Sequence, residues 1–362
     1  MRFADGLPFF MLDYGTPESP YPAAPRQVLR RVISRAADAG YSARFSGEFE
    51  FFIFRETSES VREKGYQKLQ PLSPGMFGYS ALRASTYSDE LGQLMDLLAG
   101  FGVHLEGLHT ETGPGVYEVA IAHAPALEAA DQAFLFKTAS KEILVRSGLM
   151  PTFMAKVSPD LPGSSGHVHQ SLWRDGESAF HDPSDAHGMS SVFKSYVAGL
   201  SELLPELMVM FCPTINSYKR TVPGLWAPTT ATWSPDNRTA SLRVIRSKSG
   251  KGTRVENRLV GADMNPYLAF AASLGAGLWG VEQGLTLGAP VEGNAYALSE
   301  DAAARLPRSL SEATARFRAS EAAREIFGDA FVDHYAATRD WEVAEYGKAV
   351  TDWERARYFE II

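Results

Sequence analysis

Two spacings of hydrophobic residues alternate along the chain, and the changes between them mark the expected elements. From Pro25 onwards, apolar residues recur at helical spacing as far as Gly40, which predicts a helix with proline in its first turn and glycine at its end. Residues 41–54 then alternate with a period of two, which predicts a strand. Glu48 and Glu50 share one face of this strand, and a row of apolar side chains occupies the other.

Helical spacing returns in several later segments. The helices predicted in the middle of the chain cover 88–101, 126–148 and 267–285. The last of these is apolar nearly all round and is therefore expected to be buried. Near the end, Ser309 and Glu312 match a capping box, which predicts one helix as far as Phe327. A final amphipathic helix is predicted over residues 328–357.

Strands and helices are mixed in this chain without a regular alternation. The further strands predicted are 115–121, 166–173, 240–244 and 253–259. An irregular order of this kind favours an α+β fold over a doubly wound parallel sheet. Residues 1–24 are rich in proline and glycine and are predicted to be an extended lead-in, which leaves 25–362 as the main domain.

Composition narrows the classes of partner. The 362 residues are 45% hydrophobic and 22% charged, the balance of a globular protein with a substantial core. The net charge of −8 argues against nucleic-acid and anionic-membrane partners, although a few local cations suffice for a nucleotide. A single cysteine, Cys212, excludes an intramolecular disulfide. With neither a secretory leader pattern nor a long apolar span, the chain is expected to be cytoplasmic.

Two segments carry paired acids. Glu48 and Glu50 lie about 6.6 Å apart on one strand face, a spacing that suits two neighbouring magnesium sites better than one. Glu111 and Glu118 flank a Gly-Pro-Gly turn that could hold them together as ligands. Each pattern taken alone is more typical of ordinary solvated surface charge than of a metal site.

Two further strands combine histidines or cations with hydroxyl and acidic groups. His167, His169 and Ser171 alternate onto one strand face behind a small-residue loop whose backbone could approach a phosphate. On another strand, a cation and an acid alternate between Lys251 and Arg258. Satisfied core histidines and a solvated edge strand would produce similar patterns.

The combination with a fifth segment is far more specific. Residues 216–224 read Asn-Ser-Tyr-Lys-Arg-Thr-Val-Pro-Gly, and Asp-Asn-Arg-Thr-Ala-Ser-Leu-Arg follows at 236–243. In this order, the five segments resemble the catalytic domain of the glutamine synthetase family, over about residues 25–358. The resemblance implies a curved, largely antiparallel sheet surrounded by helices. It also implies an ATP-dependent ligase that joins glutamate to an amine through a γ-glutamyl phosphate.

The resemblance assigns roles residue by residue. One divalent ion, Mg²⁺ or Mn²⁺, would be held by Glu50, Glu111 and Glu118. A second ion, bridging the ATP phosphates, would be held by Glu48, His167 and Glu256. The nucleotide positions are Glu106, His169, Ser171, Lys251 and Arg254. Glutamate and the phosphorylated intermediate would meet Arg220, Arg258 and the backbone of Gly163, and the transferred phosphate would meet Arg238 and Arg243. All these residues are present in the chain.

This inventory fits the expected chemistry. A carboxylate must be activated by phosphorylation, and divalent ions and arginines offset the repulsion between the anionic groups brought together. Such phosphoryl transfer depends on positioning more than on covalent participation by the protein. The sequence has no P-loop, no nucleophile elbow and no His-Glu-x-x-His motif, so the competing hydrolase and zinc-protease interpretations lack their motifs.

Three departures from the family pattern shape the expected substrate and assembly. Trp226 stands where glutamine synthetases carry the glutamate that binds and deprotonates ammonium, and an indole can instead form a wall for a larger amine. Pro162 replaces an asparagine that contacts glutamate. The family's small N-terminal β-domain is expected to be missing, with residues 1–24 as its remnant, so a ring-shaped homo-oligomer would be weakened or altered.

The sequence thus predicts a γ-glutamyl amide ligase of the branch that acts on polyamines and other organic amines. Two alternatives stay open at this point. One is glutamine synthetase proper, which uses ammonium. The other is a catalytically impaired relative with a binding or regulatory role.

Overall fold

The computed structural model describes residues 9–16, 18–222, 227–298 and 305–362. A ten-stranded sheet runs through it, with the main order β2-β3-β1-β6-β10-β9-β8. Its central strand β1 (Ser42–Phe54) lies between β3 (Val116–Ile121) and β6 (Gly166–Arg174), antiparallel to both. Only the pairing of β8 with β9 is parallel among the strands described, so the expectation of a largely antiparallel sheet is confirmed.

The remaining strands extend or flank this sheet. They are β2 (Leu105–Thr110), β4 (Ala124–Pro125), β5 (Met150–Thr152), β7 (Glu177–Ser178), β8 (Trp233–Pro235), β9 (Leu242–Ile245) and β10 (Arg254–Asn257). The α-helices are α1 (Pro25–Asp38), α2 (Ser58–Glu63), α3 (Ala81–Thr86), α4 (Ser88–Gly100), α5 (Ala126–Arg146), α6 (Ser191–Phe211), α7 (Pro266–Glu282), α8 (Leu310–Ala319), α9 (Glu321–Phe327), α10 (Asp329–Tyr346) and α11 (Asp352–Tyr358). Among the described residues, no helix is long and apolar enough to cross a membrane.

Strand β1 separates two hydrophobic clusters, as its alternation predicts. Phe49, Phe51 and Ile53 point into the main core beneath α5. Phe52 and Phe54, on the opposite face, pack with β3 in a smaller cluster. Glu48 and Glu50 share this second face, where the burial is less complete. The strand therefore carries its acids out of the main core and into the neighbourhood of β3 and β6.

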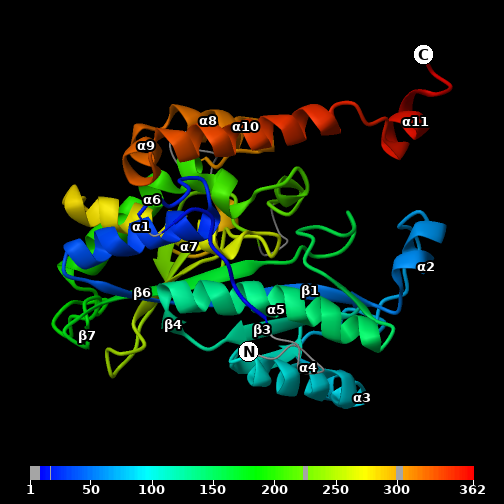
Figure 1. Ribbon diagram of the computed structural model, residues 1–362, viewed down its shortest axis with the longest axis horizontal. Helices are drawn as coiled ribbons and strands as arrows, with labels where there is room; N and C mark the ends of the chain where they lie inside the picture. The colour runs from blue at the N-terminus through cyan, green and yellow to red at the C-terminus, as the bar shows by residue number, and fades with distance from the viewer. Residues whose placement is uncertain (1–8, 17, 223–226, 299–304) are drawn as a thin grey trace.

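The helices pack in layers against the core side of the sheet. Helix α7 packs against α1 and α6, and α8 to α10 cover this layer from outside, while α11 projects beyond the body (Figure 1). Helices α6 and α7 approach closely at Gly199, where an added Cβ would come within 2.6 Å of the Cα of Gly280. This glycine contact lets two bulky apolar helices lie side by side behind the sheet.

The structure corrects two predicted helices. The segment opened by Ser309 is not one helix: Ser320 accepts a hydrogen bond from the N–H of Ala323, ends α8 and begins α9. The predicted capping box is also only half formed. The hydroxyl of Ser309 accepts from the N–H of Glu312, but the carboxylate of Glu312 accepts from the N–H of Arg308 and not from that of Ser309. The final helix divides into α10 and α11, and a complete capping box at Thr351 begins the second part.

Helix α6 was absent from the expected elements. It is 21 residues long and mostly buried, and its dense apolar composition obscures helical periodicity. A proline, Pro205, lies inside it and further weakens the sequence signal. The boundaries of the other predicted helices and strands agree with the structure to within a few residues.

Candidate active site

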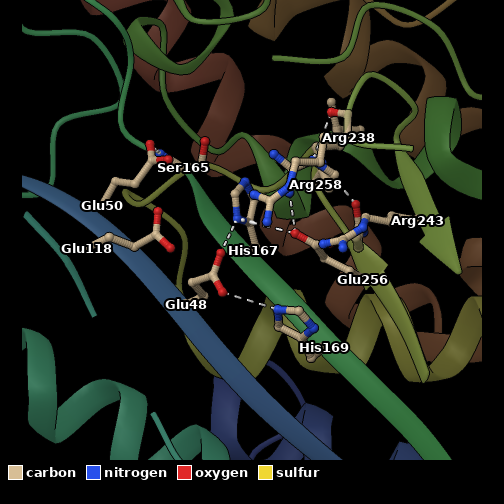
Figure 2. Close-up of polar contacts among 12 residues, drawn as sticks. Glu48, Glu50, Glu118, Ser165, His167, His169, Arg238, Arg243, Glu256 and Arg258 are labelled. Carbon is tan, nitrogen blue, oxygen red and sulfur yellow. Dashed lines mark hydrogen bonds and ion pairs between the residues drawn. The ribbon is translucent and has the colours of Figure 1, made fainter. Parts of the chain in front are cut away.

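The register of the sheet brings the predicted residues together. Glu48 on β1 lies opposite His167 on β6, and Glu50 lies opposite Glu118 on β3. On the next strand, Glu256 pairs with His169. Side chains two residues apart share a strand face, so these cross-strand pairs collect acids and imidazoles on one side of the sheet (Figure 2).

Glu48 is the centre of this cluster. Its Oε1 lies 2.7 Å from Nδ1 of His167, and its Oε2 lies 3.5 Å from Nε2 of His169. Burial by itself would raise the pKa of Glu48, but the hydrogen bonds to the two imidazoles outweigh it and hold the pKa well below its usual value. Glu48 is therefore an anion at neutral pH.

Glu256 is 1% exposed and lies between two arginines. Its Oε2 accepts from Arg243 at 3.0 Å, and its Oε1 accepts from Arg258. Burial opposes ionisation, but the charges of the neighbouring imidazoles and of Arg258 outweigh it and lower the pKa of Glu256 to about 2. Glu256, a predicted ion ligand, is thus ionised, and the positive charges of Arg243 and Arg258 balance its charge.

Several donor atoms fit a divalent cation. One oxygen or nitrogen from each of Glu48, His169 and Glu256 lies within 4.8 Å of the others, whereas the resemblance assigned His167 to this ion. Within the described part of the chain, Nε2 of His167 and Oε2 of Glu111 are buried and have no hydrogen-bond partner. Carboxylate and imidazole donors suit Mg²⁺ or Mn²⁺. Both histidines therefore belong to the cluster.

A cavity of about 270 Å³ opens on one side of this cluster. Its lining includes the predicted residues Glu50, Glu111, Glu118, Gly163, His167, Arg220, Arg238 and Arg258. Burial raises the pKa of Glu50, although the hydrogen bond from the N–H of Ser165 and the positive charge of Arg220 act to lower it. Burial also raises the pKa of Glu118, although His109 acts against it. A cation bound between these two buried carboxylates would lower their pKa values and favour their ionised forms.

Arg220 lies almost completely inside the protein, with 1% exposure. Its Nη1 donates to Oγ of Ser165 at 3.2 Å, and its Nη2 donates to the carbonyl of Leu259. A Cβ on Gly163 would lie 2.3 Å from Cγ of Arg220, so only glycine fits at this position. Gly163 therefore lets the backbone and the arginine line the same cavity.

A second cavity of about 280 Å³ lies on the other side of the Glu48–His167 pair. All five predicted nucleotide residues line it, and so does Glu48. Arg254 donates from Nε to Nδ1 of His169 at 3.2 Å and from Nη1 to the carbonyl of Gly252 at 2.9 Å. The two cavities are thus separated by the hydrogen-bonded pair Glu48–His167.

The structure adds residues that the sequence analysis missed. Tyr79 lines the first cavity, and its ring stacks on His109 with centroids 4.9 Å apart. Its N–H donates to the carbonyl of Thr110 at 2.7 Å, a contact between segments thirty residues apart that no local pattern signals. Arg44 and His123 similarly join the second cavity. Trp226, the predicted amine wall, lies outside the described residues.

Comparisons with known proteins identify the family. Residues 22–358 match the family described as "Glutamine synthetase, catalytic domain". "Type-1 glutamine synthetase 2" of Dictyostelium discoideum is 49% identical over 98% of this chain and 69% of its own length. "Glutamate--isopropylamine ligase" of a Pseudomonas species is 42% identical over 95% and 75%, and "Gamma-glutamylethanolamide synthetase GlnA4" of Streptomyces coelicolor is 41% identical over 94% and 72%.

A solved structure also shares the fold. It is described as "Apo GmaS without ligand", and it matches with a TM-score of 0.85 and 28% identity over 96% of this chain and 79% of that chain. The arrangement of the open sheet and its surrounding helices therefore agrees with the family fold that the resemblance implied. The chain belongs to the glutamine synthetase family of ATP-dependent carbon–nitrogen ligases, which act on glutamate and an amine or ammonia.

Proposed function

We propose that this chain forms a γ-glutamyl amide from glutamate and an organic amine through a γ-glutamyl phosphate. The observation that carries the proposal is the pair of cavities on the two sides of Glu48–His167. The first holds arginines and acids suited to a carboxylate and its phosphate, and the second holds cations suited to a nucleotide. Their common boundary is where a phosphoryl group would pass from one substrate to the other.

Two groups of residues would hold divalent ions. We assign Glu50, Glu111 and Glu118 to one ion and Glu48, His167 and Glu256 to the other. Bound divalent ions would neutralise the phosphate charge and polarise the phosphoryl oxygens. The buried Oε2 of Glu111, which has no partner among the described residues, supports the first assignment because such an atom costs free energy unless a ligand satisfies it. Nδ1 of His167 lies 2.7 Å from Glu48 and 3.5 Å from Glu256, which supports the second.

The arginines bind and orient the anions. Arg220 and Arg258 are held by buried hydrogen bonds, and we assign them to the glutamate carboxylate and the acyl phosphate. Arg238 and Arg243 are assigned to the phosphate in transfer. A guanidinium that is already fixed by the protein needs no reorganisation when charge moves onto a phosphate oxygen. Gly163 would present its backbone to the amino group of glutamate.

The amine would meet the acids and aromatic groups at the mouth of the first cavity. Tyr79 is 67% exposed there, and a cationic amine could bind against its ring while the acids attract the charge. This arrangement serves ammonium and organic amines alike. The preference for an organic amine rests on Trp226 in the sequence and on relatives named as isopropylamine and ethanolamide ligases.

A direct test measures ATP-dependent phosphate release with glutamate and a panel of amines. The panel contains ammonium, isopropylamine, ethanolamine and a polyamine, and the enzymes are the wild type, Trp226→Glu and the control Trp341→Glu. Trp341 is 65% exposed on α10 and lies outside both cavities. We expect the wild type and the control to prefer an organic amine, and Trp226→Glu to shift towards ammonium. A wild type that uses ammonium best would return the chain to the second candidate, glutamine synthetase proper, a name that several relatives carry.

We also propose that the chain assembles as a ring-shaped homo-oligomer. Large apolar side chains are exposed near both ends of the described chain, among them Phe10, Leu12, Trp353 and Phe359. Exposed apolar groups on the terminal segments could be covered by contacts between subunits. Light scattering behind a size-exclusion column would give the mass of the assembly. The cytoplasmic location stays a prediction.

A further inference from the structure

Arg220 follows directly on a short 3₁₀ helix, η2 (Asn216–Lys219). The N–H of Arg220 donates to the carbonyl of Ser217 at 3.1 Å, and the two residues are buried, with 1% and 0% exposure. The position of this arginine in the first cavity therefore depends on what holds η2 in place. The group that holds it is the carboxylate of Asp263, which has no part in the chemistry proposed above.

Asp263 binds two hydroxyl groups at the start of η2. Its Oδ2 accepts from Oγ1 of Thr214 at 2.9 Å and from Oγ of Ser217 at 2.5 Å. The same hydroxyls also cap the turn, because the N–H of Thr214 donates to Oγ of Ser217 at 3.0 Å and the N–H of Ser217 donates to Oγ1 of Thr214 at 3.1 Å. A hydroxyl has one proton and two lone pairs, so each one can donate to Asp263 while it accepts from the backbone. The carboxylate thus fixes the orientation of both caps.

A buried lysine holds the turn that contains Asp263. Lys137 on α5 donates from Nζ to the carbonyl of Ala262 at 2.7 Å and to the carbonyl of Met264 at 2.8 Å, the residues on either side of Asp263. Burial lowers the pKa of Lys137 to about 8, although the charge of Asp263 acts to raise it. Asp263 is therefore an anchor fixed from its own side as well.

The segment that contains Asp263 also contacts the guanidinium of Arg220. Nη2 of Arg220 donates to the carbonyl of Leu259, so residues 259–263 contact both the head of the arginine and the base of the helix before it. An arginine is long and flexible, and fixing it at both ends holds the guanidinium ready for an anion.

We propose that Asp263, acting through the hydroxyls of Thr214 and Ser217, positions Arg220 to bind glutamate. None of these three residues lines the first cavity, so Asp263 is a positioning residue that does not touch the substrate. This inference rests on the proposed function, because it takes Arg220 as a group that binds glutamate. It adds the residues behind the cavity that keep this group in place.

The test removes one hydroxyl while it keeps the shape of the side chain. Thr214→Val replaces Oγ1 by a methyl group, whereas Thr214→Ser keeps the hydroxyl. Phosphate release is measured at saturating ATP and amine while glutamate is varied, and ADP binding with Mg²⁺ is titrated calorimetrically. We expect Thr214→Val to lower kcat/KM for glutamate roughly tenfold, because a misplacement of about 1 Å can cost about a hundredfold in rate. Thr214→Ser should recover most of this loss, and ADP binding should match the wild type in both variants.

Thr57→Val is the matched control, because the chain contains a similar arrangement at the start of α2. There the N–H of Ser60 donates to Oγ1 of Thr57 at 3.2 Å, and Oγ of Ser60 donates to Oε2 of Glu56 at 2.5 Å. This cap lies outside both cavities, so the control should keep the wild-type kcat/KM for glutamate. Thermal unfolding of each variant verifies that the fold is retained.

A double-mutant cycle tests whether Asp263 and Thr214 act as one unit. Asp263→Ala and Thr214→Val break the same hydrogen bond, so the double variant should lose little more kcat/KM than Asp263→Ala alone. Asp263→Asn keeps an oxygen acceptor and should retain more activity than Asp263→Ala. The Thr214 pair decides the question even where Asp263→Ala fails to fold.

The outcomes separate the two proposals. A Thr214→Val enzyme with the wild-type kcat/KM for glutamate would overturn this inference, while the proposed function would stand. Equal losses for glutamate and ADP, or an equal loss in Thr214→Ser, would indicate general damage to the fold and overturn it as well. A wild type that releases no phosphate in response to glutamate with any amine would overturn the proposed function, and with it both proposals.

Discussion

Nδ1 of His167 lies 2.7 Å from Oε1 of Glu48, across two neighbouring strands of the sheet. Glu48 lines the second cavity and His167 lines the first, so this hydrogen bond connects the walls of the two cavities. Nδ1 also lies 3.5 Å from Oε1 of Glu256, so an ion shared by Glu48, His167 and Glu256 would take its nitrogen ligand from Nδ1. The pair thereby links the two halves of the proposed reaction.

The two histidines should differ in what they bind. Nδ1 of His169 accepts from Arg254, which leaves its proton at Nε2 facing Glu48, whereas Nδ1 of His167 faces both Glu48 and Glu256. We expect His167→Ala to weaken Mn²⁺ binding by about tenfold or more, in line with the loss of groups around a metal site. His169→Ala should mainly weaken ADP. Mn²⁺ titration followed by electron paramagnetic resonance measures the first effect, and equal Mn²⁺ affinity in His167→Ala would contradict the assignment.

Replacing Glu256 by glutamine should affect both ion binding and stability. The change leaves two buried or partly buried arginines, Arg243 and Arg258, without their shared counter-ion. Breaking a buried ion pair in this way costs about 3–5 kcal/mol of unfolding free energy. We also expect the variant to lose the Mg²⁺ dependence of ADP binding, measured by calorimetry.

The control for Glu256→Gln is Glu282→Gln. Glu282 pairs with Arg35 near the surface, where loss of an ion pair costs about 1 kcal/mol or less. Urea denaturation should therefore separate the two variants clearly. Mg²⁺-dependent ADP binding that survives in Glu256→Gln would remove this residue from the ion site.

Gly163→Ala should impair the glutamate side of the reaction. The new methyl would overlap the Arg220 side chain and the carbonyl of Ala155, at 2.3 and 2.7 Å, and would displace the arginine from the cavity. We expect kcat/KM for glutamate to fall roughly tenfold or more, because a misplacement of about 1 Å can cost about a hundredfold in rate. The KM for ATP should change little.

Gly92→Ala provides the matched control for that change. Gly92 lies in α4, and an added Cβ there meets nothing within 4 Å. Alanine should stabilise the helix by up to about 1 kcal/mol and leave the kinetics unchanged. Equal kinetics in Gly163→Ala and Gly92→Ala would show that Gly163 does not shape the glutamate site.

The acid stability of the protein should depend in part on Glu56. Lys64 donates to Oε1 at 2.6 Å, and with Ser60 and the N–H of Gln70 it lowers the pKa of Glu56 to about 2. A carboxylate with a lowered folded-state pKa stabilises the protein fully above its unfolded pKa of about 4.3. That contribution is lost as the pH falls from there through the folded value near 2.

Urea denaturation between pH 6 and pH 2 measures this effect. The difference in unfolding free energy between the wild type and Glu56→Gln should be constant above about pH 5 and shrink below about pH 4. A difference that stays constant down to pH 2 would show that Glu56 keeps an ordinary pKa in the folded protein.

The sequence by itself determined the class of the fold, the family and most of the proposed site. Alternation over 41–54 located β1 and the face of Glu48 and Glu50, because strand geometry repeats every two residues. Helix breaks were harder to predict. The division at Ser320 depends on a local cap that competes with helical spacing extending through it.

Only the tertiary structure decided how the motifs meet. The pairing of β1 with β3 and β6 sets Glu118 and His167 beside Glu50 and Glu48, and no local spacing specifies that pairing. It also brought in Tyr79 and the Arg44–His123 pair, whose partners lie far away in the chain. Local sequence encodes local conformation, whereas contacts between distant segments follow from how the strands pair and the core packs, and this is why the site's walls emerge only in the folded protein.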